Sequence, residues 1–297
     1  MVRAVALVVN PLAGRGRAAA LAEVVERRLT YHGLVVHRMP APVAASTGDL
    51  GDVPPGVDTV AAVGGDGTVH RLLPLLAGTT LALGVVPAGS GNDLAAALGV
   101  PMDPLAATDL VATGSPRLID LAVAGAADVS SAGTRWWATV LCAGFDSAVA
   151  ARAQRMRWPA GPRRYDVALL AELAALRQVP FTVTPDDEPA RRLPATLVAV
   201  GNTARYGGGL RICPAADPAD GLLDVTVVGP VTRRELLRVA PRLRTGEHLD
   251  HPAVSRFRVG SLRLDAPMVT AYADGEPVGP LPLHIACRPG TLRVIAP

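Results

Sequence analysis

Apolar and polar positions follow one rhythm over the first part of the chain, in which short apolar runs alternate with helix-like segments. Strands are expected at 4–10, 34–39, 59–63, 81–86 and 117–123, and helices at 18–29, 69–77 and 92–98. Repeated strand, helix, strand order is typical of a parallel sheet covered by helices. In such sheets, ligands bind outside the carboxyl ends of the strands.

The pattern changes after Asp120, where short strands punctuated by Gly and Pro dominate. Strands are expected at 136–144, 181–185, 195–202, 222–230, 254–266, 268–276 and 281–290, and helices at 145–156, 163–177 and 232–243. This half is typical of a mostly antiparallel sandwich or barrel with a few helices. The sequence therefore predicts an α/β domain over 1–122 and a β-rich domain over 123–297 with a cleft between them. The last residues could return to the first domain.

Composition supports two compact domains and makes some classes of binding partner unexpected. The 297 residues are 49% hydrophobic and 19% charged, enough to bury two cores. Net charge is only +3 and no lysine occurs, so a general nucleic-acid surface is not expected. The three cysteines have no metal-ligand spacing, which indicates a reduced, cytoplasmic chain. Pro and Gly interrupt the uncharged stretch 72–92, so no transmembrane span is predicted.

Three glycine-bearing turns follow strands of the first domain and should meet at one edge of the sheet. Glycine lets backbone N–H groups approach phosphate oxygens, and the helix that follows adds a favourable dipole. A tight turn alone explains any single loop. It does not explain the Asp, Thr, Ser and Asn residues that the three loops carry between them. The candidate nucleotide-binding residues are Asn10, Pro11, Gly14, Arg15, Gly64, Gly65, Asp66, Gly67, Thr68, Gly89, Ser90, Gly91 and Asn92.

These motifs resemble those of the diacylglycerol kinase family. GGDGT at 64–68 is similar to the nucleotide signature of diacylglycerol, sphingosine and ceramide kinases and, more distantly, of NAD kinases. PAGSGNDLA at 87–95 and NPLAGRG at 10–16 resemble the lipid kinases in particular. The resemblance implies an ATP-dependent lipid kinase that uses Mg²⁺ and converts diacylglycerol to phosphatidic acid at a membrane surface. Open alternatives are a sphingoid-base or other lipid kinase, an NAD kinase-like enzyme and a nucleotide-binding protein without turnover.

Two acidic turns in the second half are candidate sites. Asp217 and Asp220 could hold a hard cation with a nearby carbonyl, or could form an exposed Asx turn. The resemblance implies a structural Mg²⁺ on both aspartates and the backbone oxygen of Leu222. Asp274 and Glu276 lie in a D-G-E turn that is either a plain hairpin or the source of a general base.

The resemblance implies that the D-G-E turn supplies the base, with Asp274 as the first candidate, Glu276 beside it and Asp66 as the rival. Asp93 and Asp120, together with Asp66, are second-rank candidates for a catalytic Mg²⁺. An N-cap or a strand-end ion pair explains Asp93 and Asp120 equally well. His70 and Arg71 replace the Asn-Glu that many family members have after GGDGT. His70 is expected on a partly exposed helix face.

A stretch from Arg152 to Arg164 mixes arginines with Trp158. It could touch anionic headgroups, but a solvated helix face is the favoured interpretation. The resemblance also raises the prospect of a homodimer and of peripheral membrane association.

Overall fold

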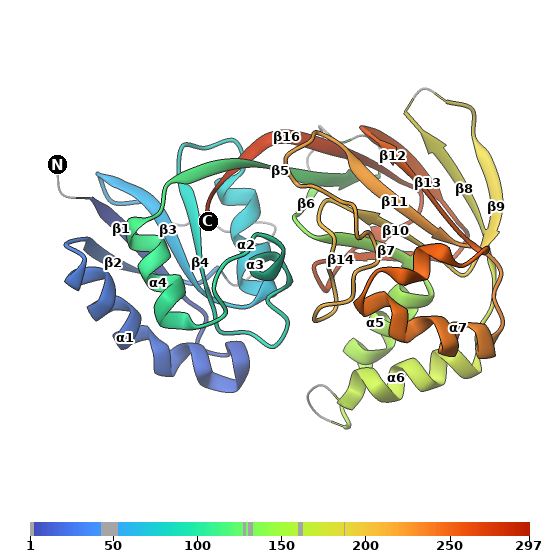
Figure 1. Cartoon of the computed structure of the whole chain (residues 1–297), viewed down its shortest axis with the longest axis horizontal. Coiled ribbons are helices and arrows are strands. Elements are labelled where there is room, and N and C mark those ends of the chain that lie inside the picture. The colour runs from blue at the N-terminus through green and yellow to red at the C-terminus, as the bar shows by residue number, and fades with distance from the viewer. Residues whose placement is uncertain (1–2, 43–52, 127–128, 130–132, 160–162, 187) are drawn as a thin grey trace.

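The chain folds into two lobes that share one long sheet, as Figure 1 shows for the computed structural model. The structure describes residues 3–42, 53–126, 129, 133–159, 163–186 and 188–297. The expected fold class is confirmed, because parallel strands form the first lobe and an antiparallel sandwich forms the second.

The nucleotide lobe, as we call the first lobe, is built on four parallel strands. They are β1 (Ala4–Val9), β2 (Val35–Pro40), β3 (Val57–Gly64) and β4 (Ala82–Pro87), in the order β2-β1-β3-β4. Buried side chains of α1 (Arg17–Tyr31) pack on one face of this sheet, and those of α2 (Asp66–Leu76) and α3 (Asp93–Ala97) pack on the other. The short η1 turn (Ala13–Gly16) leads into α1.

One helix of this lobe escaped the sequence analysis. Helix α4 (Pro104–Thr113) begins with Pro at its first position, and the Asp103 side chain accepts a hydrogen bond from Ala106 N at 2.8 Å. Asp followed by Pro is a helix-start signal. The signal was present, but apolar residues lie on the exposed as well as the buried face of the helix, as Leu105 and Ala107 do, and this weakens the helical period.

Two long strands run from one lobe into the other. β5 (Pro116–Gly125) and β16 (Leu283–Ile295) are antiparallel to each other. The end of β16 pairs in parallel with β4, with Arg293 opposite Ala82, while its beginning pairs with β13 (Ser261–Asp265). The predicted boundary near residue 122 therefore falls inside a continuous strand.

The acceptor lobe, as we call the second lobe, is a sandwich of two sheets. The six-stranded sheet has the order β12-β11-β10-β7-β14-β15 and is antiparallel throughout. Its strands are β12 (Val254–Val259), β11 (Leu223–Val228), β10 (Leu197–Gly201), β7 (Val140–Gly144), β14 (Thr270–Ala273) and β15 (Glu276–Pro280). The facing sheet continues the long one through β6 (Arg135–Trp137), β8 (Val179–Pro185), β9 (Arg191–Ala195) and β13. Side chains such as Leu141 and Ile285 fill the core between them.

Two predicted strands of this lobe are wrong as single elements. The run 136–144 divides into β6 and β7, which belong to different sheets, and 254–266 divides at Gly260 into β12 and β13. In the first case the amides of Ala138 and Thr139 donate to the Asp274 carboxylate instead of to a neighbouring strand. Where the amides of a strand donate to a side chain, the strand ends, and the chain can continue in another sheet.

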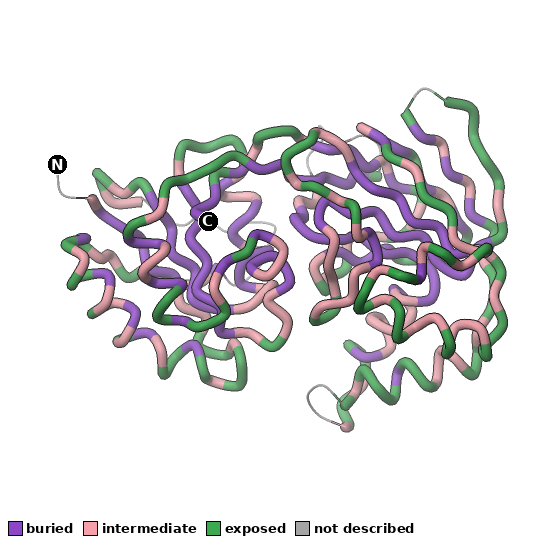
Figure 2. Tube along the Cα trace, viewed as in Figure 1, coloured by how far each residue is buried: buried purple, intermediate pink, exposed green. Residues whose placement is uncertain are grey.

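Helices lie outside the sandwich. They are α5 (Phe145–Arg155), α6 (Arg163–Ala174) and α7 (Arg233–Val239), followed by the 3₁₀ turns η2 (Ala240–Arg244) and η3 (Glu247–Asp250). Figure 2 shows buried strands in both lobes and a largely exposed α6, in which Ala168 is the buried residue.

Candidate functional site

The three glycine loops meet at one edge of the sheet, which confirms the expected convergence. The Asn10 side chain, after β1, donates from Nδ2 to Thr68 Oγ1 at the start of α2, at 3.1 Å. The amide of Asn92, at the start of α3, donates to Asp66 Oδ2 at 2.7 Å. Each loop is thus joined to the GGDG turn by a hydrogen bond.

The loops touch backbone to backbone. A Cβ on Gly65 would lie 2.8 Å from the Cα of Gly89, and one on Gly89 would lie 2.5 Å from the Cα of Gly65. Gly14 has a φ of +59° and faces the carbonyl of Ala88, 2.1 Å from where its Cβ would be. Such contacts require glycine, so these residues set the spacing of the loops as well as any approach to phosphate.

Asp66 opens α2 in the middle of these loops. Its carboxylate accepts hydrogen bonds from the amides of Asn92 and Leu94. Burial, followed by the charge of Asp93, raises the pKa of Asp66 to about 6 despite those two donors. The carboxyl therefore changes charge near neutral pH, which is unusual for Asp.

Asp93 binds the acceptor lobe to the nucleotide lobe. Its two oxygens accept the amides of Gly208 and Gly209 at 2.8 Å each, from the glycine turn that follows β10. Burial raises its pKa, and the two amides oppose that shift. From the sequence, Asp93 could be an N-cap or a metal ligand; in the structure its carboxylate accepts two amides between the lobes.

Asp274 is buried under four donors. Ala138 N, Thr139 N and Thr139 Oγ1 lie 3.0, 2.9 and 2.5 Å from its oxygens, and His70 Nδ1 lies 3.0 Å away. Burial alone would raise the pKa of Asp274, but these donors and the charge of His70 hold it below the ordinary value. A carboxylate bound this way takes up a proton poorly, which does not fit Asp274 as the first candidate base.

Glu276, two residues further along the turn, is differently placed. Its Oε1 lies 3.8 Å from the position of a Cβ on Gly67, so the carboxylate faces the GGDG loop. Its backbone pairs with Ala273 in the ladder between β14 and β15, but its side chain makes no hydrogen bond or ion pair with any residue that the structure describes. A free carboxylate beside a phosphate loop can accept a proton from an incoming hydroxyl.

Asp120 lies with the other acidic turn. Its oxygens accept the amides of Gly221 and Gly290 at 2.7 Å each, which ties the 217–222 turn to β16. Asp217 accepts Ala219 N at 3.0 Å and Asp220 accepts Leu222 N at 2.9 Å, so both aspartates form Asx turns. No group of three or more His, Cys, Asp or Glu side chains suited to a metal occurs in the described part of the chain.

Several site residues were missed in the sequence. Arg258 forms an ion pair with Asp220, and also with Asp224 at 3.5 Å. His70 is buried rather than partly exposed, which corrects the expectation from its helical position. The charged register pair of Asp224 and Arg258 on neighbouring strands was detectable only with the β11 to β12 pairing known.

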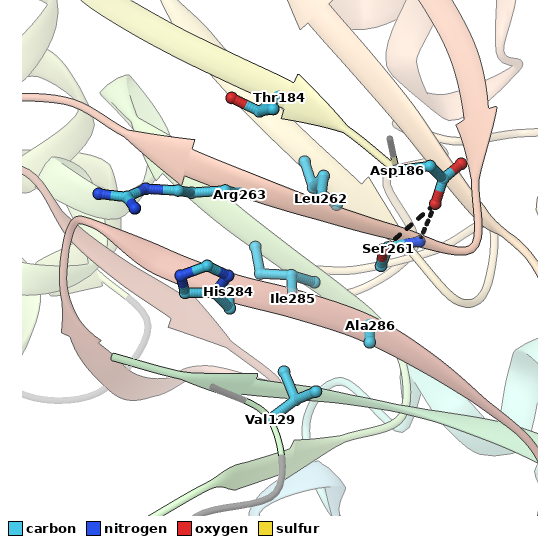
Figure 3. A pocket seen from close by; sticks show the side chains of 9 residues that line it. All are labelled: Val129, Thr184, Asp186, Ser261, Leu262, Arg263, His284, Ile285 and Ala286. Carbon is cyan, nitrogen blue, oxygen red and sulfur yellow. Dashed lines mark hydrogen bonds between the residues drawn. The ribbon is translucent and has the colours of Figure 1, made fainter. Parts of the chain in front are cut away.

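One pocket lies in the acceptor lobe. Figure 3 shows it over β8, β13 and β16, with a volume of about 300 Å³ and with Thr184, Arg263 and His284 among its lining. None of the sequence-predicted site residues lines it. We place the functional site at the loops, because amides and carboxylates converge there. Convergent polar groups of this kind can bind a ligand, whereas the pocket lies on an open sheet face.

Converging glycine loops in one lobe and a carboxylate that faces them from the other are the arrangement expected of a two-lobed kinase. The diacylglycerol kinase catalytic domain family matches residues 4–124, and the YegS C-terminal NAD kinase beta sandwich-like domain matches 139–296. A Mycobacterium tuberculosis protein named diacylglycerol kinase is 41% identical, with 97% of this chain and 93% of that protein covered. The chain belongs to the diacylglycerol kinase-like family of lipid kinases.

Solved structures share the fold. A diacylglycerol kinase from Bacillus anthracis is 19% identical, with a TM-score of 0.69 and coverage of 100% of this chain and 97% of that chain. An NAD kinase from Archaeoglobus fulgidus in complex with ATP is 13% identical, with a TM-score of 0.55 and coverage of 99% and 93%. Both likenesses concern the two-lobed architecture.

A methyl group at Gly65 should separate the loops. We expect Gly65→Ala to destabilise the protein by about 1–3 kcal/mol, as overpacking does, and to lower its melting temperature by a few degrees. Gly67→Ala is the matched control, because its Cβ would meet no heavy atom closer than 3.8 Å and would lie inside α2. Calorimetry that gives both variants the same melting temperature would contradict this account.

The raised pKa of Asp66 predicts a pH-dependent stability. A carboxyl whose pKa in the folded state is about 6 stabilises the fold fully when the pH is below its ordinary pKa of 3.8. This stabilisation is lost as the pH rises through 6. Asp66→Asn cannot ionise, so its melting temperature relative to the parent should rise between about pH 4 and pH 7. Thermal melts across that range test this, and a constant difference would count against the shift.

Proposed function

We propose that this protein transfers the γ-phosphate of ATP to the hydroxyl of a lipid, with diacylglycerol as the acceptor and phosphatidic acid as the product. The observation that carries the proposal is the position of Glu276, which faces Gly67 of a phosphate loop from the other lobe. The loops joined through Asn10, Gly65 and Gly89 support nucleotide binding. The name of the Mycobacterium tuberculosis relative supports diacylglycerol.

Glu276, rather than Asp274, is the proposed general base. It accepts the proton of the lipid hydroxyl while that oxygen forms a bond to the γ-phosphorus and the bond to the bridging oxygen of ADP breaks. Backbone amides of the glycine loops and the N-terminus of α2 stabilise the phosphates. Asp274 orients the turn, because all its donors are fixed parts of the fold.

Mg²⁺ is proposed on the oxygen donors of the acidic turn. Asp217, Asp220 and the carbonyl of Leu222 are the hard ligands that Mg²⁺ prefers, and they are within one turn. Arg258 pairs with Asp220 in the structure, so a cation there would compete with the guanidinium. A Mg²⁺ that arrives with ATP would offset phosphate charge, with Asp66 as the nearest proposed carboxylate.

A basic and apolar surface on α5, α6 and their connection is proposed to meet the membrane. Trp158 is 83% exposed and Leu170 is 64% exposed, with exposed arginines at 155, 157 and 163 around them. Exposed aromatic and aliphatic side chains among cations suit an anionic bilayer. The surface is joined to the site, since Gln154 Nε2 on α5 donates to Gly275 O at 3.0 Å.

None of the helices among the described residues is long and apolar enough to cross a membrane. Peripheral association is proposed on the ground of the exposed surface described above; a cytoplasmic location and a homodimer stay predictions.

Radiolabel transfer tests the function. Purified protein and γ-labelled ATP are incubated with dioleoylglycerol, sphingosine, ceramide or NAD, and we expect label in phosphatidic acid. Glu276→Gln should lower kcat by about 10²–10⁴-fold with the Kd for ATP little changed, because a general base acts only in the transition state. Label on NAD or sphingosine alone would replace the proposed acceptor, and none on any acceptor would favour a nucleotide-binding protein.

Thermal melts, together with the radiolabel assay, separate the roles of Asp274 and Glu276. Asp274→Asn should lower the melting temperature by several degrees, since it leaves buried donors unpaired, whereas Glu276→Gln should melt close to the parent. Activity retained by Glu276→Gln would refute the choice of base.

Vesicle sedimentation tests the membrane surface. We expect binding to phosphatidylglycerol-containing vesicles that weakens with salt, and roughly tenfold weaker binding after Trp158→Ser with Leu170→Gln, because apolar insertion is lost. Tyr31→Ser is the control, as Tyr31 is 79% exposed on α1 of the other lobe. Equal binding by all three proteins would exclude this surface.

A further inference from the structure

His70 joins the nucleotide lobe to the turn that carries the proposed base. It lies on α2, one turn after the GGDG loop, and its Nδ1 is 3.0 Å from Oδ2 of Asp274. Both side chains are almost fully buried, at 7% and 4% exposed. A buried hydrogen bond between an imidazole and a carboxylate is geometrically specific and costly to leave unmade.

The four donors on Asp274 do not come from the same lobe. Three belong to Ala138 and Thr139, at the break between β6 and β7 in the acceptor lobe. His70 is the one of the four that comes from the nucleotide lobe. Without it, Asp274 would still be held by its own lobe, but the turn would lose its connection to α2.

The tight turn links the position of Asp274 to that of Glu276. Asp274 and Gly275 have φ values of +52° and +83°, a tight left-handed pair that leads directly into β15 at Glu276. The carboxylate of Glu276 then faces Gly67, which is three residues before His70 on the same helix. The helix that carries His70 therefore also carries the loop residue that Glu276 faces.

We propose that His70 is a positioning residue for phosphoryl transfer, which fixes Glu276 over the phosphate loop by holding Asp274 across the two lobes. This inference rests on the proposed function, because it gives His70 a role in the reaction assigned above. The group that matters is a hydrogen-bond donor at the place of Nδ1. A displacement of about 1 Å at a reacting group can cost on the order of 10²-fold in rate.

The charges around His70 favour its protonated form. Burial alone would lower its pKa, but the hydrogen bond and charge of Asp274, together with the charge of Glu276, raise it, while Arg135 opposes them. Asp66 and Asp93 add negative charge near Asp274. A raised folded pKa stabilises the protein fully below the ordinary value of 6.5, and this stabilisation is lost as pH rises through the folded value.

Three substitutions separate positioning from mere packing. In Asn, Nδ2 can occupy the place of Nδ1, whereas Gln carries its amide one carbon further out and Ala has no donor. We expect kcat to fall roughly 10- to 100-fold in His70→Ala and His70→Gln, with KM for ATP within about threefold, and expect His70→Asn to recover most of kcat. His37→Asn is the matched control, because His37 lies on β2, which pairs with β1 at the end of the strand order away from β4.

A second readout does not depend on kinase activity. Nuclear magnetic resonance titration of the six imidazoles, with His70→Asn for assignment, should give His70 a pKa above 6.5 that falls in Asp274→Asn. The melting temperature of the parent relative to His70→Asn should be higher at about pH 5.5 than at pH 8.5.

The outcomes are distinguishable. If the parent phosphorylates no acceptor, the proposed function fails, and the titration still decides whether His70 holds Asp274. If the parent is active but His70→Asn loses as much kcat as His70→Ala, or His70→Ala loses none, the positioning role is overturned. An imidazole pKa unmoved by Asp274→Asn would overturn the contact itself.

Discussion

The close approach of backbone at Gly65 and Gly89 is the constraint on which the nucleotide lobe depends. β3 and β4 run in parallel register up to Gly64 and Pro87, and the chains that leave them touch at Gly65 and Gly89, one and two residues later. A Cβ at either glycine would force the loops apart. Because they touch, the first amides of α2 and α3 and the carboxylate of Asp66 share one edge, where phosphate can be bound.

Buried carboxylates then fix the acceptor lobe against that edge. Asp93 accepts two amides from the glycine turn after β10, and Asp274 accepts from His70. Asp66 and Asp274 interact electrostatically and both lose solvation in the fold, yet the pKa of Asp66 is raised and that of Asp274 is lowered. The difference comes from their partners: two amides do not offset burial at Asp66, whereas four donors, one of which is the His70 imidazole, do so at Asp274.

Sequence patterns predicted the loops and most strands, because apolar runs and glycine turns are local signals. Apolar residues on both faces of α4 concealed its period, and only Asp103 and Pro104 marked its start. The break at Ala138 could not be foreseen, since it depends on Asp274, which lies 136 residues further along the chain. The burial of His70 has the same cause: the acceptor lobe that covers it is distant in sequence, so helical periodicity alone cannot indicate it.

The last strand has a consequence for the order in which the protein can form. β4 is an edge of the four parallel strands until residues near Arg293 arrive to pair with it. An unpaired strand edge invites association with other chains. During synthesis, the nucleotide lobe therefore keeps one flank unpaired until the residues near Arg293 have been made.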